Sequence, residues 1–190
     1  MSSESSSPFT PVSDLQTVIE SEVKEWHFHI YFHQRNETEH QAALALRDAV
    51  LRLRRDGAFV AVPLFRVNTD PIGPHPVGSY EIWVPSETFV HVYSYLCQNR
   101  GELSILIHPL TRDQRKDHSI RASWIGSPFP LDLSTLPIRS TNVPSQYQSL
   151  KLGYSSTVPP LTLDERQKLG DNVEKILAGE KEAARAPPRA

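Results

Sequence analysis

Residues 26–33 read Trp-His-Phe-His-Ile-Tyr-Phe-His, and this stretch decides the fold. Its side chains alternate between two faces, which is the period of a β-strand with one face against a core. One face carries only hydrophobic residues, while the other carries His27, His29 and Tyr31. The stretch therefore predicts a strand that packs on helices with one face and presents imidazoles on the other.

The elements after this strand follow a regular order. A capping pattern at Asn36 begins an amphipathic helix that Gly57 would close. The next elements are predicted as a strand at 58–67, a strand at 78–84, a helix at 86–101 capped by Ser86, and a strand at 103–108. Pro63 indicates that the strand at 58–67 is an edge strand or contains a bulge. The order β-α-β-β-α-β predicts an α+β fold with a ferredoxin-like antiparallel sheet and two helices on one face.

The segments outside residues 25–130 differ in composition. Residues 1–24 are rich in Ser and Pro and too polar to join a core, so we expect a separate N-terminal segment. Residues 131–190 read as a proline-rich C-terminal extension with a helix near 162–178 that begins at a capping box. The last residues are expected to form a disordered tail.

Composition excludes several functional classes. The 20 Lys and Arg residues nearly balance the 22 Asp and Glu residues, which argues against a nucleic-acid or anionic membrane surface. No secretory signal and no membrane-spanning run is found, so a cytoplasmic protein is expected. The single cysteine excludes an intrachain disulfide and a cysteine-rich zinc module. Any bound metal must therefore be held by histidine.

Five of the eight histidines fall where the predicted sheet could bring them together. His27 and His29 point the same way from one strand. His108 ends the strand that lies beside the first in this sheet order, and His75 stands between two prolines that restrict its backbone. His118 follows in a polar loop. Their convergence predicts a metal site, although each histidine taken alone is more often a structural residue than a ligand.

Other polar side chains have two interpretations each. Glu81 could complete a two-histidine, one-carboxylate iron site or remain a surface residue. Tyr31 could donate a hydrogen bond in the pocket or pack in the core. Asp117 could orient His118, and Arg121 could pair with a substrate carboxylate or form a surface salt bridge. The remaining histidines are expected at the surface and the cysteine in the core: His33, His40, His91 and Cys97.

Four motifs in order resemble the DOPA 4,5-dioxygenase family of small extradiol dioxygenase-like proteins. They are WHFHIYF, PIGPHPVGSYEI, a strand ending in IHP, and DH followed by RASWIG, and they span residues 25–130. The resemblance implies a dimeric, α+β barrel-like domain that opens the ring of DOPA or a related catechol with O2. Such a reaction would serve pigment biosynthesis or the breakdown of aromatic compounds.

The resemblance also implies that the histidines of these motifs are the functional ones, but the motifs do not divide them into metal ligands and acid or base. Three are expected to hold non-haem Fe(II), or Zn in the purified protein: His29, His75 and His108. His27 and His118 would then serve as catalytic acid and base, with Tyr31 and Arg121 as substrate contacts. The expected partners are the catechol, O2 and a second copy of the chain. The alternative is a non-catalytic module on the same scaffold that binds a metal or a small molecule.

Overall fold

The structure, a computed structural model, describes residues 10–187, which divide into two compact units. One unit spans residues 23–157, and the other comprises the described residues before and after it. Residues 131–157, which the sequence placed in the C-terminal extension, thus lie in the larger unit. The start of the predicted N-terminal segment and the end of the predicted disordered tail, residues 1–9 and 188–190, lie outside the described residues.

A five-stranded antiparallel sheet forms the centre of the larger unit. Its strands are β1 (Glu25–Phe32), β2 (Val62–Pro63), β3 (Gly78–Pro85), β4 (Ser104–Pro109) and β5 (Ser123–Ile125). They lie in the order β2-β3-β1-β4-β5, and every pair is antiparallel. The strand that carries His27 and His29 is therefore central, with β3 on one side and β4 on the other. This arrangement agrees with the predicted α+β class.

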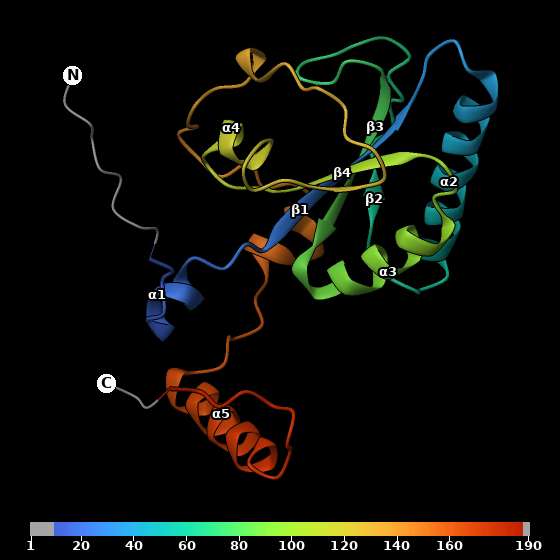
Figure 1. Cartoon of the computed structure of the whole chain (residues 1–190). Helices are drawn as coiled ribbons and strands as arrows, with labels where there is room; N and C mark the ends of the chain where they lie inside the picture. The colour runs from blue at the N-terminus through green and yellow to red at the C-terminus, as the bar shows by residue number, and fades with distance from the viewer. Residues whose placement is uncertain (1–9, 188–190) are drawn as a thin grey trace, which may run out of the picture. The chain divides into compact units, whose positions relative to one another are not determined.

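Two helices, α2 (Glu37–Arg55) and α3 (Phe89–Asn99), lie on one side of the sheet (Figure 1). The Asn36 side chain caps α2 by accepting a hydrogen bond from the Glu39 N–H at 3.2 Å. Gly57, at φ +86°, follows the helix end in the left-handed conformation that glycine favours. Between the sheet and these helices lies a core that includes Phe28, Ile30, Val50, Ile82, Leu96 and Ile105.

Two local predictions in this region were wrong. The strand expected at 58–67 is only two residues long, Val62–Pro63. The Leu64 N–H still donates to the Glu81 oxygen of β3 at 2.8 Å, and the carbonyl oxygens of Leu64 and Phe65 accept from Arg47 Nη2 at 2.9 and 3.0 Å. The position of this strand at the sheet edge is as predicted. Ser86 does not cap a single long helix; it begins a 3-10 turn, Ser86–Thr88, that precedes α3.

Cys97 was predicted in the core, and this prediction was wrong as well. The helix α3 buries Val92 and Leu96, which lie on the side toward the sheet. Cys97 lies one position beyond Leu96, about 100° around the helix, and its side chain is exposed. A cysteine inside an amphipathic pattern was thus assigned to the wrong side of the helix.

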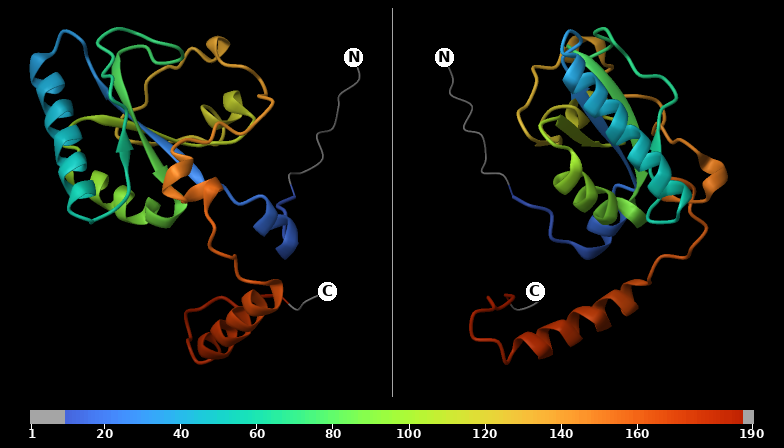
Figure 2. Two further views of the ribbon diagram at one scale, coloured as in Figure 1. Left: turned by 180° about the vertical axis from the view of Figure 1, so that it is seen from behind. Right: turned by 90° about the vertical axis from the view of Figure 1, so that its right-hand side faces the viewer.

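The helix-free face of the sheet is covered by the chain that follows β4 (Figures 1 and 2). This covering segment, residues 110–157, contains the short helix α4 (Gln114–Asp117) and the strand β5. It also forms 3-10 turns at Leu133–Thr135, Gln148–Leu150 and Gly153–Ser155. Aromatic rings pack across the contact, with Trp124 and Phe129 on Tyr31 and Tyr147 on Trp83.

A buried carboxylate joins the end of the covering segment to the sheet. Glu25, at the start of β1, is fully buried and accepts hydrogen bonds from Trp83 Nε1 at 2.9 Å, from the Gln146 N–H at 3.2 Å and from the Tyr154 N–H at 3.0 Å. Gly153 lies so close that a Cβ there would meet the Glu25 side chain at 2.5 Å. Since buried carboxylates are costly unless hydrogen-bonded, this arrangement specifies where residues 146–154 lie.

The smaller unit contains the helices α1 (Leu15–Glu20) and α5 (Leu163–Leu177). The predicted capping box is present, because Thr162 and Glu165 exchange side-chain and backbone hydrogen bonds at the start of α5. Within this unit Arg166 forms an ion pair with Glu22 at 3.2 Å. Among the described residues, no helix has the length and apolar character needed to cross a membrane.

Candidate metal centre

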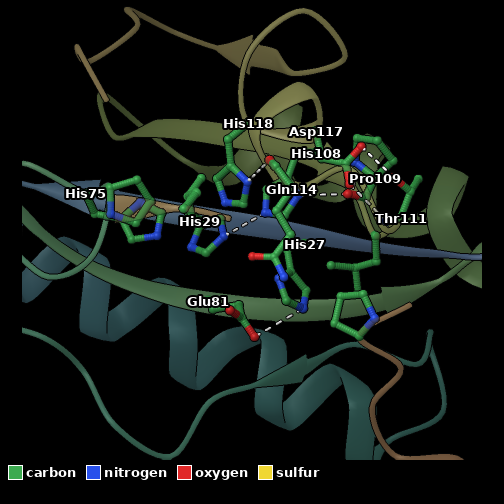
Figure 3. A pocket seen from close by; sticks show the side chains of 14 residues that line it. His27, His29, His75, Glu81, His108, Pro109, Thr111, Gln114, Asp117 and His118 are labelled. Atoms are coloured by element: carbon green, nitrogen blue, oxygen red, sulfur yellow. Dashed lines mark hydrogen bonds and ion pairs between the residues drawn. The ribbon is translucent and has the colours of Figure 1, made fainter. Parts of the chain in front are cut away.

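Five histidines meet on the helix-free face of the sheet (Figure 3). His27 and His29 come from β1, and His108 comes from β4, where it is the register partner of His27. His75 comes from the loop before β3, and His118 follows α4. Together they line a cavity of about 200 Å³. This volume lies below the ~300–1,000 Å³ typical of sites for drug-sized ligands, which indicates a small ligand.

The ring nitrogens converge on His29. His29 Nε2 and His108 Nε2 lie 3.1 Å apart. Two groups of three histidines place their nitrogens within 4.8 Å of one another, and both contain His29: His27, His29 and His108 form one, and His29, His75 and His118 form the other. The trio expected from the sequence, His29, His75 and His108, is thus divided between these two groups.

Backbone carbonyls determine the tautomers of two of these histidines. His108 Nδ1 lies 2.9 Å from the Pro109 oxygen, and His118 Nδ1 lies 3.0 Å from the Gln114 oxygen. A carbonyl oxygen can only accept, so each Nδ1 carries the hydrogen and donates it. In a neutral ring this leaves Nε2 with a free lone pair. Histidine ligands of metals commonly use their second nitrogen in this way.

His75 is held by Tyr31. The Tyr31 hydroxyl lies 2.6 Å from His75 Nδ1 and is buried. Burial raises the pKa of the Tyr31 hydroxyl, which keeps it protonated at neutral pH. The backbone of His75 also pairs with Ile72 in a tight turn at Gly73, where φ is +54°. Tyr31 thus contacts a site histidine but does not itself line the cavity.

Burial keeps the cluster uncharged. Together with nearby histidines, which contribute less, it lowers the pKa of His27 to about 3 and that of His75 to about 4. The pKa values of His29 and His108 also lie well below the usual value, for the same two reasons. Burial lowers the pKa of His118, the most lightly shifted of the five. Neutral imidazole is the form that binds a metal or accepts a proton.

Glu81 lies at the edge of the cluster. Its Oε1 atom is 3.2 Å from His27 Nε2 and 3.2 Å from Gln146 Nε2, which donates to it. The His27 contact is short but not aligned as a hydrogen bond, and His27 Nε2 is buried without a hydrogen-bond partner among residues 10–187. Burial raises the pKa of the Glu81 carboxyl.

Asp117 has different partners from the one expected, and Arg121 forms salt bridges, which was one of its two expected roles. The Asp117 carboxylate accepts from Thr111 and from Arg121 Nη1 at 2.9 Å, whereas His118 donates to the Gln114 carbonyl. The expected hydrogen bond from His118 to Asp117 was therefore wrong. Arg121 also contacts Asp113 at 3.4 Å and is absent from the residues that line the cavity.

Some residues of the cavity could not be selected from any sequence pattern. Leu136 and Pro144 of the covering segment line it, and Gln146 of the same segment bonds Glu81. These residues follow no periodic pattern, so only the three-dimensional path of the segment identifies them.

Of the three histidines expected at the surface, His33 pairs with Glu39 at 2.8 Å and is largely exposed. His91 is exposed, and His40 is half-buried and stacks on Phe32.

Comparison with known proteins gives consistent matches. A sequence model of the Dopa 4,5-dioxygenase family matches residues 26–135. A protein of Amanita muscaria named DOPA 4,5-dioxygenase is 73% identical over 179 residues, covering 94% of this chain and 78% of the relative. An uncharacterized protein of Botryotinia fuckeliana is 39% identical over 115 residues, covering 56% of this chain and 60% of that protein.

A solved structure gives a similar result. The crystal structure of a proposed dioxygenase from Nostoc punctiforme superposes with a TM-score of 0.53 at 29% identity, over 60% of this chain and 90% of that one. Its name and that of the Amanita relative support a dioxygenase function. With the family match over more than half of the chain and close identity to a curated member, the chain belongs to the Dopa 4,5-dioxygenase family.

Proposed function

We propose that this protein is a metal-dependent extradiol dioxygenase that opens the ring of DOPA or a related catechol with O2. The observation that carries the proposal is the cluster of five neutral histidines, four of them buried and His118 half-buried, around one small cavity. The name of the relative with 73% identity supports DOPA as the first substrate to test. In the proposed reaction, one ring bond beside the hydroxyls breaks and both oxygen atoms of O2 enter the product.

The donor set fits a metal ion such as Fe(II), and Zn could occupy the same ligands in purified protein. Two imidazole nitrogens that bind one ion at ~2.1 Å lie roughly 3.0–3.4 Å apart. The 3.1 Å between His29 Nε2 and His108 Nε2 lies in this range. The buried His27 Nε2, without a hydrogen-bond partner in residues 10–187, is a further polar atom that a ligand would satisfy.

We infer that His29 and His108 bind the ion together. His27 completes the group in which these two converge, and is therefore our choice for the third ligand. The sequence had favoured His75 in this role and His27 as an acid or base. With His27 as a ligand, His75 and His118 are left as the candidate acid and base.

Within the site the protein's own residues bind and orient the catechol and move its protons. When bound, the metal would supply Lewis acidity toward the two catechol oxygens and the one-electron chemistry that reaction with O2 needs. The His118 Nε2 lone pair can take a proton from a catechol hydroxyl and later return it, because its Nδ1 is held by Gln114. Tyr31 orients His75 beside it.

We also propose that the sheet is ferredoxin-like. The strand order β2-β3-β1-β4, with α2 and α3 on one side, supports a ferredoxin-like sheet to which β5 adds one strand. The homodimer and the cytoplasmic location stay predictions.

The proposal is tested with anaerobically Fe(II)-loaded protein given DOPA and then air. We expect a yellow ring-opened product and uptake of one O2 per DOPA. His29→Ala and His108→Ala should each lower both metal content and kcat/KM by about 100-fold or more, as expected for lost ligands. His91→Ala, at an exposed position, should leave both unchanged.

Two outcomes decide the details. Metal content measured in His27→Ala and His75→Ala identifies the third ligand, since only the ligand's loss should release the ion. If metal-loaded wild-type protein yields no ring-opened product from DOPA or any other catechol, the dioxygenase proposal is wrong and a non-catalytic binding module is the better account.

A further inference from the structure

A second cavity, of about 210 Å³, adjoins the histidine cavity. The two share part of their lining, which consists of His29, Pro74, His75 and Glu81. The remaining wall of the second cavity is built from the loop after β2 and from the start of β3. Its polar members there are Arg66, Asn68 and Ser79. A molecule whose ring lies among the histidines can therefore extend into this space.

Ser79 offers an unused hydroxyl to the second cavity. It faces the helix-free side of β3, opposite Tyr31 in the strand register, and is 1% exposed. Its backbone forms two hydrogen bonds with Asn68, each of 2.9 Å. Its Oγ atom is buried with no hydrogen-bond partner among the described residues. Since buried polar atoms are almost always paired, a lone hydroxyl that lines a cavity points to a ligand atom.

Arg66 brings a positive charge to the same cavity. Arg66 is exposed, and within residues 10–187 its guanidinium group forms no ion pair and no hydrogen bond. The backbone just before it is held in place, because Arg47 donates to the carbonyl oxygens of Leu64 and Phe65. The amide of Asn68, which also lines the cavity, has no side-chain hydrogen bond in the described part of the chain either. A held loop with a free guanidinium group suits the capture of an anion.

We propose that the second cavity is a carboxylate subsite, in which Arg66, aided by Asn68 and Ser79, binds the carboxylate of a catechol substrate whose ring lies in the histidine cavity. The inference rests on the proposed function and makes it more specific. It predicts that the protein selects catechols with a carboxylate on the side chain, such as DOPA, over catechols that have an amine or a methyl group alone. Arg66 is thus assigned as a specificity residue with no part in the chemical step.

The test measures binding by anaerobic titration calorimetry on Zn-loaded protein, which isolates affinity from turnover. The four probes are DOPA and dihydrocaffeate, which have a carboxylate, and dopamine and methylcatechol, which have none. We expect Arg66→Gln to raise the Kd of the first two by about 10- to 100-fold, the range for a lost hydrogen bond to a charged group. The Kd of the other two should stay within about twofold.

Two matched variants complete the experiment. Arg52→Gln removes the same charge from an exposed position on α2 and should leave all four Kd values unchanged. Ser79→Ala should weaken the same two carboxylates as Arg66→Gln, by a smaller factor. If Arg66→Gln weakens all four probes equally, or leaves DOPA binding unchanged, the carboxylate subsite is wrong.

Turnover of the Fe(II)-loaded protein is measured separately, so the two proposals can fail independently. Selective binding of the carboxylates without any ring opening would uphold the subsite and contradict the dioxygenase proposal. Ring opening of DOPA that Arg66→Gln does not impair would uphold the dioxygenase and contradict the subsite.

Discussion

His108 and His118 show how one backbone contact determines what a side chain can do. Each ring donates its Nδ1 hydrogen to a carbonyl, of Pro109 or of Gln114, so each turns an unprotonated Nε2 toward the cavity. Burial then disfavours the charged form of both rings. The result is a set of lone pairs directed at one place, which a set of exposed histidines would not provide.

The same burial makes the metal-free protein sensitive to acid. A histidine with a folded-state pKa of about 3, such as His27, stays neutral in the folded protein as the pH falls below 6.5. In the unfolded chain the same histidine has its ordinary pKa of 6.5 and takes up a proton in that range. Unfolding is therefore favoured as the pH falls from about 6.5 toward 4, and stability is fully present above that window. Between pH 6.5 and 5 each strongly shifted histidine should reduce the free energy of unfolding by about 2 kcal/mol.

Urea unfolding of the metal-free protein at pH 8 and pH 5 measures this effect. His27→Gln should show a smaller loss of stability between the two pH values than wild type, while His91→Gln, at an exposed position, should show the same loss. An equal loss in wild type and His27→Gln would contradict the assignment of acid sensitivity to the buried cluster.

At the scale of elements, Glu25 links the first strand to the last part of the covering segment. The two oxygens of its carboxylate accept from three N–H donors. A glutamine in its place would have only one acceptor oxygen. Glu25→Gln should lower the free energy of unfolding by about 1–3 kcal/mol, because buried N–H groups lose their acceptor. It should also expose residues 143–157 to proteolysis.

Urea unfolding and limited proteolysis test this link, with Glu102→Gln as a control at an exposed position. Proteolysis of Glu25→Gln at the same rate and in the same places as wild type would show that other contacts hold the segment.

The elements differ in how well the sequence predicts them, for physical reasons. The strand β1 and the helix α2 follow from local patterns, a strict two-residue alternation and a capped amphipathic repeat. The register between β1 and β4 brings His27 beside His108, as the predicted sheet order implies. The helix α4 and the strand β5 are only four and three residues long, too short to show a period.

The candidate site divides in the same way. All five histidines that line the cavity were candidates from the sequence. Strand alternation indicated His27 and His29, sheet order indicated His108, and flanking prolines indicated His75, whereas His118 followed only from its place in a polar loop and in the DH motif. Their individual roles could not be assigned, because the tautomers depend on carbonyl groups that every residue possesses. Cavity residues such as Leu136 and Pro144 depend on long-range packing of a segment without periodicity.

At the scale of the whole molecule, the residues that line both cavities lie within residues 23–157. Truncation after residue 157, which removes α5, should therefore leave kcat/KM for DOPA within about twofold of the full chain. Truncation after residue 143 removes Pro144 and Gln146, and with them two of the three hydrogen-bond donors to Glu25, and should lower kcat/KM at least tenfold. Steady-state kinetics on metal-loaded proteins measure both, and a large loss from the first truncation would contradict a site confined to the larger unit.

The covering segment also affects the order in which the site can form during synthesis. A ribosome completes all five histidines of the cluster by residue 118, whereas the covering segment runs on to residue 157. At ~5–20 residues per second the ribosome adds the rest of the segment over about 2–8 s. The four site histidines that precede the covering segment, His27, His29, His75 and His108, are therefore made before it is complete, so closing the cavity is a late step in the folding of this unit.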